Sequence, residues 1–257
     1  MAFGETLNLL LSTAGIAVAP SIRAAIEAHV RLLMSWNTAM NLTAIRSPGA
    51  VALEHVADSL SALPLLHKLG RADRALPSML DLGSGAGFPG LPLGLALPVG
   101  RLALLDSVRK KARFLGVAAT AAVEAARRAG EADPPLVEVH AQRAEELVRS
   151  PGERAGWDIV TARAVAPLAE LVELALPFLC VGGRLVAWKR DAGDGGLDRE
   201  IAEAAPRLLA CGARLEGVEE VRIEGLKDHR LVVVQAVSTV PDRYPRPAAE
   251  RRRDRGA

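Results

Sequence analysis

A glycine-rich segment, residues 81–90, holds the residues whose types and spacing most directly indicate chemistry. It reads Asp-Leu-Gly-Ser-Gly-Ala-Gly-Phe-Pro-Gly, and Asp106 follows further along the chain. Because glycine has no Cβ atom, the backbone of such a loop can approach a ligand closely. A helix starting after the loop would add free N–H groups at its first turn. The segment therefore predicts a binding loop for a nucleotide-like ligand.

Two kinds of ligand fit this loop. Gly85, Gly87 and Gly90 match the Gly-x-Gly-x-x-Gly pattern of dinucleotide sites. The frame that begins at Asp81 and includes Gly83 matches the acidic loop of methyltransferases instead. We favour the second frame, because a carboxylate attracts the sulfonium and ammonium groups of S-adenosylmethionine and repels a pyrophosphate. Asp106 does not discriminate, since it could accept ribose hydroxyls in either class or cap the following helix.

The catalytic motifs that the sequence lacks reduce the number of possible methyl acceptors. Enzymes that methylate exocyclic amines carry an Asn/Asp-Pro-Pro-aromatic turn after the fourth strand, where residues 161–168 read Thr-Ala-Arg-Ala-Val-Ala-Pro-Leu. Methylation of a pyrimidine carbon needs a nucleophilic cysteine, and neither Cys180 nor Cys211 follows a strand end. A ring nitrogen such as guanine N7 needs no general base, because its lone pair is free at neutral pH. Catalysis of its methylation reduces to proximity and alignment.

Parallel strands with connecting helices must position these residues. Short apolar runs predict seven strands, at 79–82, 102–105, 136–139, 159–161, 185–188, 218–223 and 231–237. Helical patterns separate most of them, at 91–97, 107–128, 144–149, 168–179 and 197–209. Only residues 225–230 join the last two strands, which predicts a closing antiparallel hairpin. The pattern favours an α/β fold with the Rossmann-like, seven-stranded, mostly parallel sheet of class I methyltransferases and helices on both faces.

Three zones divide the chain. Residues 1–75 read as a helical extension, with candidate helices at 21–40 and 51–66. Residues 76–240 form the predicted S-adenosylmethionine-binding domain. Residues 241–257 carry an arginine run without apolar periodicity, which predicts a basic, mobile tail.

Composition sets bounds on location and partners. The 257 residues are 50% hydrophobic and carry a formal net charge of +2, so charge alone neither demands nor excludes nucleic acid. The two cysteines form no CxxC or metal-ligand spacing, and we expect neither a disulfide nor a metal site. The N-terminus lacks the basic region of a signal peptide, and no apolar run approaches the roughly 18 residues that span a bilayer. A cytoplasmic protein without membrane contact is expected.

Several motifs resemble one family, the RsmG or glucose-inhibited division protein B family, which makes 7-methylguanosine in bacterial small-subunit ribosomal RNA. The matching segments occur in family order, at residues 36–45, 55–59, 81–92, 105–107, 109–115, 143–146, 162–164, 188–189 and 229–230. The Asn-Leu-Thr segment and the Gly-Phe-Pro-Gly loop are the most specific. The chain departs from the family after residues 244–246, where Pro-Ala-Ala-Glu and an arginine run follow.

The resemblance implies a set of cofactor contacts and a substrate. With the loop residues Asp81 and Gly85 it indicates S-adenosylmethionine as methyl donor, without a metal, and small-subunit (16S) ribosomal RNA or an assembled 30S subunit as partner. No obligate protein partner is evident. The implied donor-binding residues are Gly83, Phe88, Asp106, Ser107, Val108, Ala144, Glu145 and Arg163.

A basic run follows Asp106 and could bind that RNA. Arg109, Lys110 and Arg113 share a helical face, and Lys111 is expected to point elsewhere. The run predicts a phosphate-binding patch, to which we add Lys189, although a solvated helix face explains it equally well. A hydrogen bond between His55 and Asp58 and a core position for Trp36 are also expected. Alternative functions are a small-molecule methyltransferase, an NAD-dependent oxidoreductase and a non-catalytic RNA-binding module.

Overall fold

One seven-stranded sheet organises the chain. The computed structural model describes residues 2–69 and 77–253. Its strand order is β3-β2-β1-β4-β5-β7-β6, with β7 antiparallel to both neighbours and the other pairs parallel. The predicted fold class and closing hairpin are confirmed. The strands are β1 (Ser78–Leu82), β2 (Arg101–Leu105), β3 (Leu136–His140), β4 (Trp157–Arg163), β5 (Leu179–Arg190), β6 (Ala213–Glu220) and β7 (His229–Ala236).

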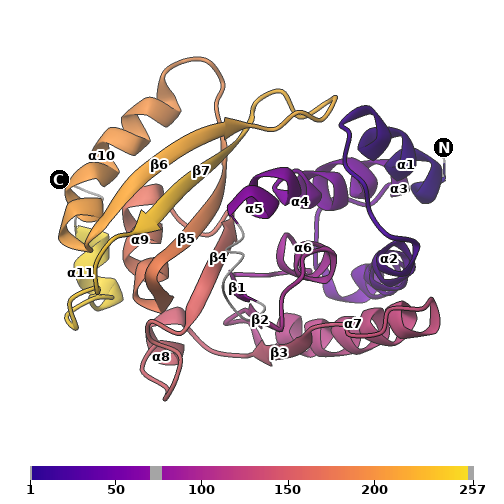
Figure 1. Ribbon diagram of the computed structural model, residues 1–257, viewed down its shortest axis with the longest axis horizontal. Coiled ribbons are helices and arrows are strands. Elements are labelled where there is room, and N and C mark those ends of the chain that lie inside the picture. The colour runs from indigo at the N-terminus through magenta and orange to yellow at the C-terminus, as the bar shows by residue number, and fades with distance from the viewer. Residues whose placement is uncertain (1, 70–76, 254–257) are drawn as a thin grey trace.

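Apolar side chains on both faces of the central strands create two cores. In β2, Leu102 and Leu104 enter one core, whereas Ala103 and Leu105 enter the other. Successive strand residues point to opposite faces, so a nearly continuous apolar run is what a doubly covered sheet requires. The central strands therefore need helices on both sides (Figure 1).

The N-terminal helices cover the first face together with α6 and α7. Helix α2 packs along α7, at the right of Figure 1. The segment expected to form one helix over 51–66 is instead divided into a π-helix, η1, and two short α-helices. The boundary predicted near residue 75 lies outside the described residues. These elements are α1 (Phe3–Thr13), α2 (Pro20–Met40), α3 (Pro48–Ala50), η1 (Val51–Ala57), α4 (Asp58–Leu60), α5 (Leu63–Leu69), α6 (Gly90–Ala96) and α7 (Arg109–Arg128).

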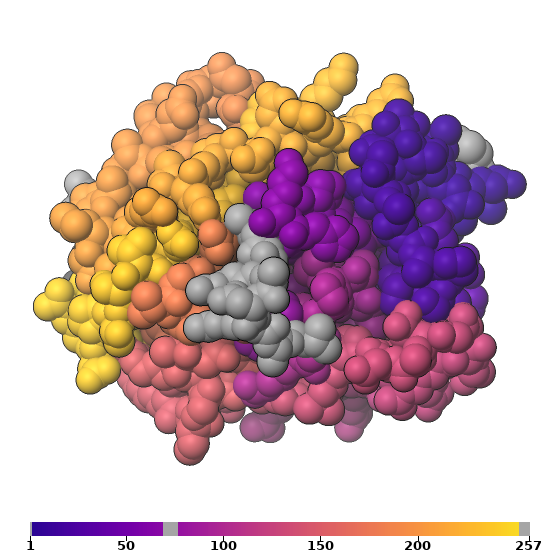
Figure 2. Space-filling view, in the orientation of Figure 1, coloured from indigo at the N-terminus to yellow at the C-terminus, as the bar shows by residue number. Residues whose placement is uncertain are grey.

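The second face is covered by later helices and by the end of the chain. These are α8 (Ala144–Leu147), α9 (Leu168–Ala175), the 3₁₀ turn η2 (Leu176–Phe178), α10 (Gly196–Ala210) and α11 (Ala248–Arg253). Residues 241–253 of the predicted tail, here called the C-terminal segment, pack against this face, which their sequence pattern did not predict. Tyr244 is buried in the second core, and α11 lies far from the N-terminus in Figures 1 and 2. Residues 254–257 of the predicted tail lie outside the described residues.

Element boundaries differ from the predictions where side chains or glycines intervene. The helix expected from residue 107 begins at Arg109, because the Asp106 carboxylate accepts the N–H of Val108 at 2.8 Å. Strand β5 extends back to Leu179 through two glycines that weaken its sequence pattern. No disulfide joins Cys180 and Cys211, and the Cys180 thiol contacts Asp158 at 3.6 Å. No helix in the described ranges is both long enough and apolar enough to span a membrane.

Candidate functional site

The glycine loop, residues 83–89, joins β1 to α6 at the carboxyl edge of the sheet, where open α/β folds bind ligands. Gly83, Gly85 and Gly87 have positive φ angles of 68°, 58° and 95°. Other residue types rarely adopt this conformation, so the glycine spacing fixes the path of the loop. A Cβ atom on Gly83 would also lie 2.8 Å from the Val165 side chain.

Asp81 lies beneath the loop and is completely buried. Its Oδ2 accepts the Gly90 N–H at 3.1 Å, and its Oδ1 accepts the Thr161 hydroxyl at 2.7 Å. Burial raises the pKa of Asp81 to about 6, against the effect of these hydrogen bonds. The contacts give Asp81 a role in ordering the loop. Its direct contact with a ligand ammonium group stays a prediction, and both carboxylate oxygens already bind protein donors.

Asp106 links the loop to the start of α7. One carboxylate oxygen accepts the Gly85 N–H at 3.0 Å and the other accepts the Val108 N–H at 2.8 Å. The sequence allowed Asp106 to be the N-cap of α7, but the N-cap is Val108, and no side chain caps the helix. A carboxylate oxygen can accept more than one hydrogen bond, so the ribose role also stays open as a prediction.

A first cleft of about 820 Å³ begins at the glycine loop and extends over α8. It brings together four of the predicted donor-binding residues: Gly83, Ser107, Ala144 and Glu145. The exposed Val108 lies outside its lining. These groups combine backbone, hydroxyl and carboxylate acceptors around a volume typical of small-molecule sites.

A second cleft of about 560 Å³ lies on the other side of the same loop. Gly83 borders both clefts, and Gly85 and Phe88 line the second one. Arg163 also lies in this second cleft, apart from Ser107, Ala144 and Glu145 in the first. The remaining lining includes Thr43, His55, Asp58, Lys111, Trp188 and His229.

Asp58 organises the floor of the second cleft. Its carboxylate accepts an Arg163 N–H at 2.6 Å and the His229 Nδ1–H at 2.8 Å. Its backbone carbonyl accepts the Trp188 indole N–H at 2.9 Å. The expected hydrogen bond between His55 and Asp58 is wrong: α4 turns Asp58 toward strands β4 and β7, and its carboxylate contacts Arg163 and His229.

His55 belongs to a chain of hydrogen bonds from Arg163 to Thr43. Arg163 is only a donor, so the His55 Nδ1 atom, 3.2 Å away, must accept. The neutral ring then carries its proton on Nε2 and donates it to the Thr43 hydroxyl at 2.8 Å. Burial, together with the positive charge of Arg163, lowers the pKa of His55 to about 3.

Phe88 lies between two imidazole rings. Its ring centroid is 4.7 Å from both the His29 and the His55 ring. His29 is fully buried, burial lowers its pKa to about 4, and its Nε2–H donates to the Ala86 carbonyl at 2.7 Å. Phe88 thereby anchors the glycine loop on the N-terminal helices. No sequence pattern selects His29, because only the fold brings it under the loop.

The basic run occupies the first turns of α7. Arg109, Lys110 and Arg113 are exposed, and Lys110 donates to the Met40 carbonyl at 3.2 Å. Lys111 points away from these three, as expected, and lines the second cleft, which none of them lines. Lys189 pairs with Glu200 at 2.6 Å, so its predicted RNA contact would compete with an existing ion pair. Trp36 packs against Phe114, as expected of a core position.

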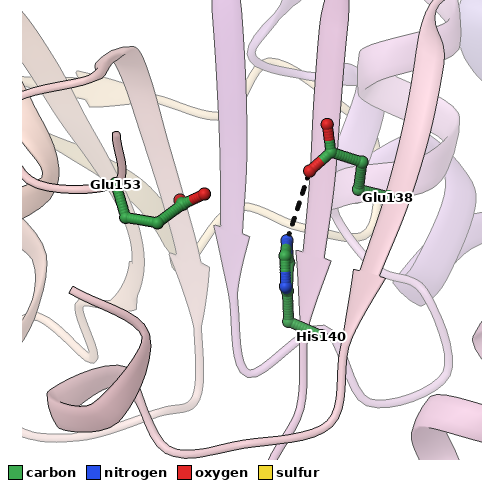
Figure 3. Close-up of side chains that lie close together, drawn as sticks. All are labelled: Glu138, His140 and Glu153. Carbon is green, nitrogen blue, oxygen red and sulfur yellow. Dashed lines mark ion pairs between the residues drawn. The ribbon is translucent and has the colours of Figure 1, made fainter. Parts of the chain in front are cut away.

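Glu138, His140 and Glu153 form a separate cluster with metal-ligand chemistry (Figure 3). Arg101 binds both carboxylates, at 2.9 and 3.0 Å to Glu138 and 2.9 Å to Glu153. Its guanidinium also lies 4.1 Å from the centre of the Trp157 ring. Because Arg101 already binds both carboxylates, we interpret the cluster as a structural ion network.

The strand order, the acidic glycine loop and the clefts at the carboxyl edge define a class I methyltransferase. An O-methyltransferase from Bacillus cereus, solved in complex with SAH, has this fold with a TM-score of 0.50 at 16% identity, covering 81% of this chain and 90% of that chain.

The sequence comparisons then define the family. The family model described as rRNA small subunit methyltransferase G matches residues 22–221. Ribosomal RNA small subunit methyltransferase G of Dehalococcoides mccartyi is 38% identical over 239 residues, covering 93% of each chain. The protein of the same name from Chloroflexus aggregans is 37% identical over 248 residues, covering 95% of each chain. The chain belongs to the rRNA small subunit methyltransferase G family.

Sequence reasoning assigned no functional role to five residues of the second cleft. Each occurs in or beside a segment that carried the family resemblance, which was the only signal for them. Local spacing could not reveal their contacts, because the partners are far apart in sequence. The five are Thr43, His55, Asp58, Trp188 and His229.

Proposed function

We propose that this protein transfers the methyl group of S-adenosylmethionine to N7 of a guanine in small-subunit ribosomal RNA. The observation that carries the proposal is the pair of clefts that meet at Gly83. The first cleft would bind the adenosyl part of the donor, and the second would receive the guanine. The glycine loop between them would hold the donor with its methyl group directed toward the acceptor.

The predicted donor contacts divide between the two clefts. Ser107, Ala144 and Glu145 would surround the adenosyl group in the first cleft. Arg163, in the second, would meet the methionine carboxylate or a substrate phosphate, while Asp81 and Phe88 support the loop from behind.

The charges of the second cleft support a nucleic-acid substrate. Four basic side chains and two acidic ones line it. Three of the basic ones are in ion pairs, with Asp58, Glu200 and Asp228, and the fourth, Lys111, is the one that the proposal relies on most. Positive charge beside the reaction site favours a phosphate backbone over a neutral small molecule. The basic side chains are Lys111, Arg163, Lys189 and Arg190.

The same cleft suits a reaction that needs no general base. Guanine N7 reacts through a free lone pair, so the protein must position the base in line with the donor methyl group. The buried His29 and the half-buried His55 beside the loop have pKa values lowered to about 4 and about 3, and both remain neutral at pH 7. In duplex RNA the N7 edge lies in a deep, narrow groove, so the target guanine must be exposed or flipped out.

Methyl transfer to purified ribosomal subunits tests the function. We expect radiolabel from S-adenosylmethionine to enter small subunits and to be recovered as 7-methylguanosine after nucleoside digestion. The variant Lys111→Ala should reduce the transfer rate by about tenfold, as expected when one charge-assisted hydrogen bond is removed. Arg127→Ala, at the far end of the same helix, is the matched control. Label recovered in another nucleoside, or only in small molecules, would overturn the proposal.

A further inference from the structure

The C-terminal segment is attached to the second face of the sheet by buried ionic contacts. Glu173 is 1% exposed. It accepts the Arg246 backbone N–H at 2.6 Å and two guanidinium N–H groups of Arg246 at 3.0 Å each. Arg154 donates to the carbonyls of Val240, Pro241 and Tyr244 at 3.0 Å each. Charge-assisted hydrogen bonds are the strong ones, so this attachment fixes where the following helix lies.

Arg251 connects that helix to two others. Its side chain is 4% exposed, although arginine is among the residues least often buried. Its guanidinium contacts Glu145 of α8, Glu170 of α9 at 3.3 Å, and the carbonyl of Arg246. The chain end is thereby joined to the helix that carries a predicted donor-binding residue.

The C-terminal segment also forms one wall of the first cleft. Arg246, Pro247, Ala248 and Arg251 line it, facing a lining that includes Gly83 and Ser107. With this wall in place the cleft still measures about 820 Å³, which is ample for a nucleoside-sized ligand. The segment therefore borders the cleft without filling it.

We propose that residues 246–251 complete the donor pocket and that Arg251 is a positioning residue that orients Glu145 toward the exocyclic amine of the donor's adenine. This inference rests on the proposed function. Arg251 contacts Oε1 of Glu145, which restricts rotation of the carboxylate and presents an oriented acceptor to the purine edge. Burial raises the pKa of Glu145, but the hydrogen bonds from Arg251 and the backbone, together with the positive charges of Arg251 and Arg143, outweigh burial, and the net direction is downward. The acceptor accordingly stays ionised.

The proposal predicts a loss of base discrimination and not only a loss of affinity. S-adenosylhomocysteine and S-inosylhomocysteine are suitable probes, because the inosine form replaces the amine with a carbonyl. A site that binds an amine through a fixed carboxylate rejects a ligand that lacks the amine. We expect calorimetry on the full chain to find a strong preference for the adenosyl form.

In Arg251→Ala, the affinity for S-adenosylhomocysteine should fall about tenfold. The ratio of its affinity to that of S-inosylhomocysteine should also become smaller. The donor KM should rise while the KM for small subunits stays unchanged. Arg251→Lys retains the charge without the planar fork and should show the same effects in weaker form, which keeps the test valid if the alanine variant folds poorly. Arg243→Ala is the matched control, since Arg243 is exposed on the same segment and outside the cleft lining.

Three results would overturn the proposal. Unchanged binding of S-adenosylhomocysteine in both Arg251 variants would mean that residues 246–251 play no part in donor binding. Tighter adenosyl binding would make Arg251 a competitor for Glu145. Weaker binding of S-adenosylhomocysteine, with an unchanged preference for it over S-inosylhomocysteine, would mean that Arg251 has only a structural role. All three presuppose that the unsubstituted protein binds the adenosyl probe; if it binds neither probe, the proposed function fails first and the positioning role fails with it.

Discussion

The buried carboxylate of Asp58 restricts what Arg163 can do in the second cleft. Arg163 donates to Asp58 and to the Glu54 carbonyl at 2.9 Å, so it is part of the structure before any ligand arrives. Sequence reasoning alone expects Arg163→Ala to impair methylation far more than folding. The contacts require a revision, because removing Arg163 leaves a buried charge with one compensating partner fewer.

We therefore expect Arg163→Ala to reduce the free energy of unfolding by about 3 kcal/mol, as for a broken buried ion pair. Combining it with Asp58→Asn should cost less than the sum of the two single changes, with a coupling of about 1–3 kcal/mol. Urea denaturation of the four proteins measures this cycle. Arg190→Ala, which breaks an exposed pair with Asp228, is the control and should cost less than about 1 kcal/mol. Additive effects would mean that Arg163 and Asp58 act independently.

His29 should make stability depend on pH. Its pKa is about 4 in the folded chain and near 6.5 when unfolded, so only the unfolded chain gains a proton between these values. The contribution of His29 to stability is then full above pH 6.5 and falls by about 1.4 kcal/mol per pH unit as the pH drops toward 4, a loss of about 3 kcal/mol. His55, whose pKa is lowered to about 3, acts in the same direction over this range. The raised pKa of Asp81, about 6, acts in the opposite direction between pH 6 and its ordinary value.

A variant isolates this histidine. His29→Gln retains an N–H donor for Ala86 but does not titrate. Between pH 6 and 5, its unfolding free energy should therefore change with pH by about 1.4 kcal/mol per pH unit less than that of the unsubstituted chain. His67→Gln, at an exposed position on α5, should leave the slope unchanged. Equal slopes in all three proteins would contradict a buried neutral His29.

The sequence predicted individual residues well where a backbone requirement or a family motif selected them. Gly83 and Gly85 do adopt positive φ angles, as a ligand loop requires. The positive φ of Ala164, 56°, has no sequence signature, because alanine does not favour this conformation. The role of Asp58 could not be predicted from the sequence either, because its partners Arg163 and His229 are more than a hundred residues away along the chain.

At the scale of elements, the first turns of α7 present a basic face beside both clefts. Replacing Arg109, Lys110 and Arg113 with alanine should weaken small-subunit binding and reduce the log–log salt slope by roughly 0.7–0.9 for each phosphate that is no longer neutralised. Donor affinity should stay nearly constant, because none of the three lines the first cleft. Filter binding over a salt series measures the slope.

The control for that experiment lies on the same helix. Arg127 and Arg128 occupy the last turn of α7, and their replacement with alanine removes charge away from the glycine loop. If both variants bind small subunits equally at every salt concentration, the first turns of α7 are a solvated face. The RNA surface would then have to be sought elsewhere, for example on the N-terminal helices.

Elements governed by local pattern were predicted, and elements governed by distant contacts were not. Apolar runs located six of the seven strands closely, because a doubly covered sheet imposes those patterns directly. The sixth was predicted at 218–223, whereas β6 begins five residues earlier, at Ala213, and ends at Glu220. The π-helical turns of η1 were missed, since the same residues also fit a regular helix. The C-terminal segment was missed because its arginines look solvated until Glu173 and Glu145 are brought to them.

At the scale of the whole molecule, the glycine loop lies between the N-terminal helices and the C-terminal segment, which the sequence analysis interpreted as an extension and a tail. The N-terminal helices support it through His29 and His55 on either side of Phe88. The C-terminal segment borders the first cleft from the other side. Composition and periodicity predicted the sheet but not this enclosure, which depends on contacts between the two ends of the chain and its centre.

Because many parts of the chain converge on the loop, donor binding should stabilise the protein as a unit. At a ligand concentration one hundred times Kd, the gain in unfolding free energy is about 2.7 kcal/mol. For a chain of this size that corresponds to a rise in Tm of roughly 5–10 °C. We expect S-adenosylhomocysteine to produce this shift in thermal unfolding, and NAD to produce none, because Asp81 and Asp106 place negative charge where a pyrophosphate would lie.

Gly83→Ala provides the control for the site of binding. Its Cβ would meet Val165 at 2.8 Å and its φ of 68° is unfavourable for alanine, so the loop must shift and the ligand-induced rise should shrink sharply. Gly130→Ala also changes a glycine of positive φ, but in open space after α7, and should retain the full rise. A shift with NAD equal to that with S-adenosylhomocysteine would favour a dinucleotide site at the glycine loop. An undiminished shift in Gly83→Ala would place the ligand away from that loop.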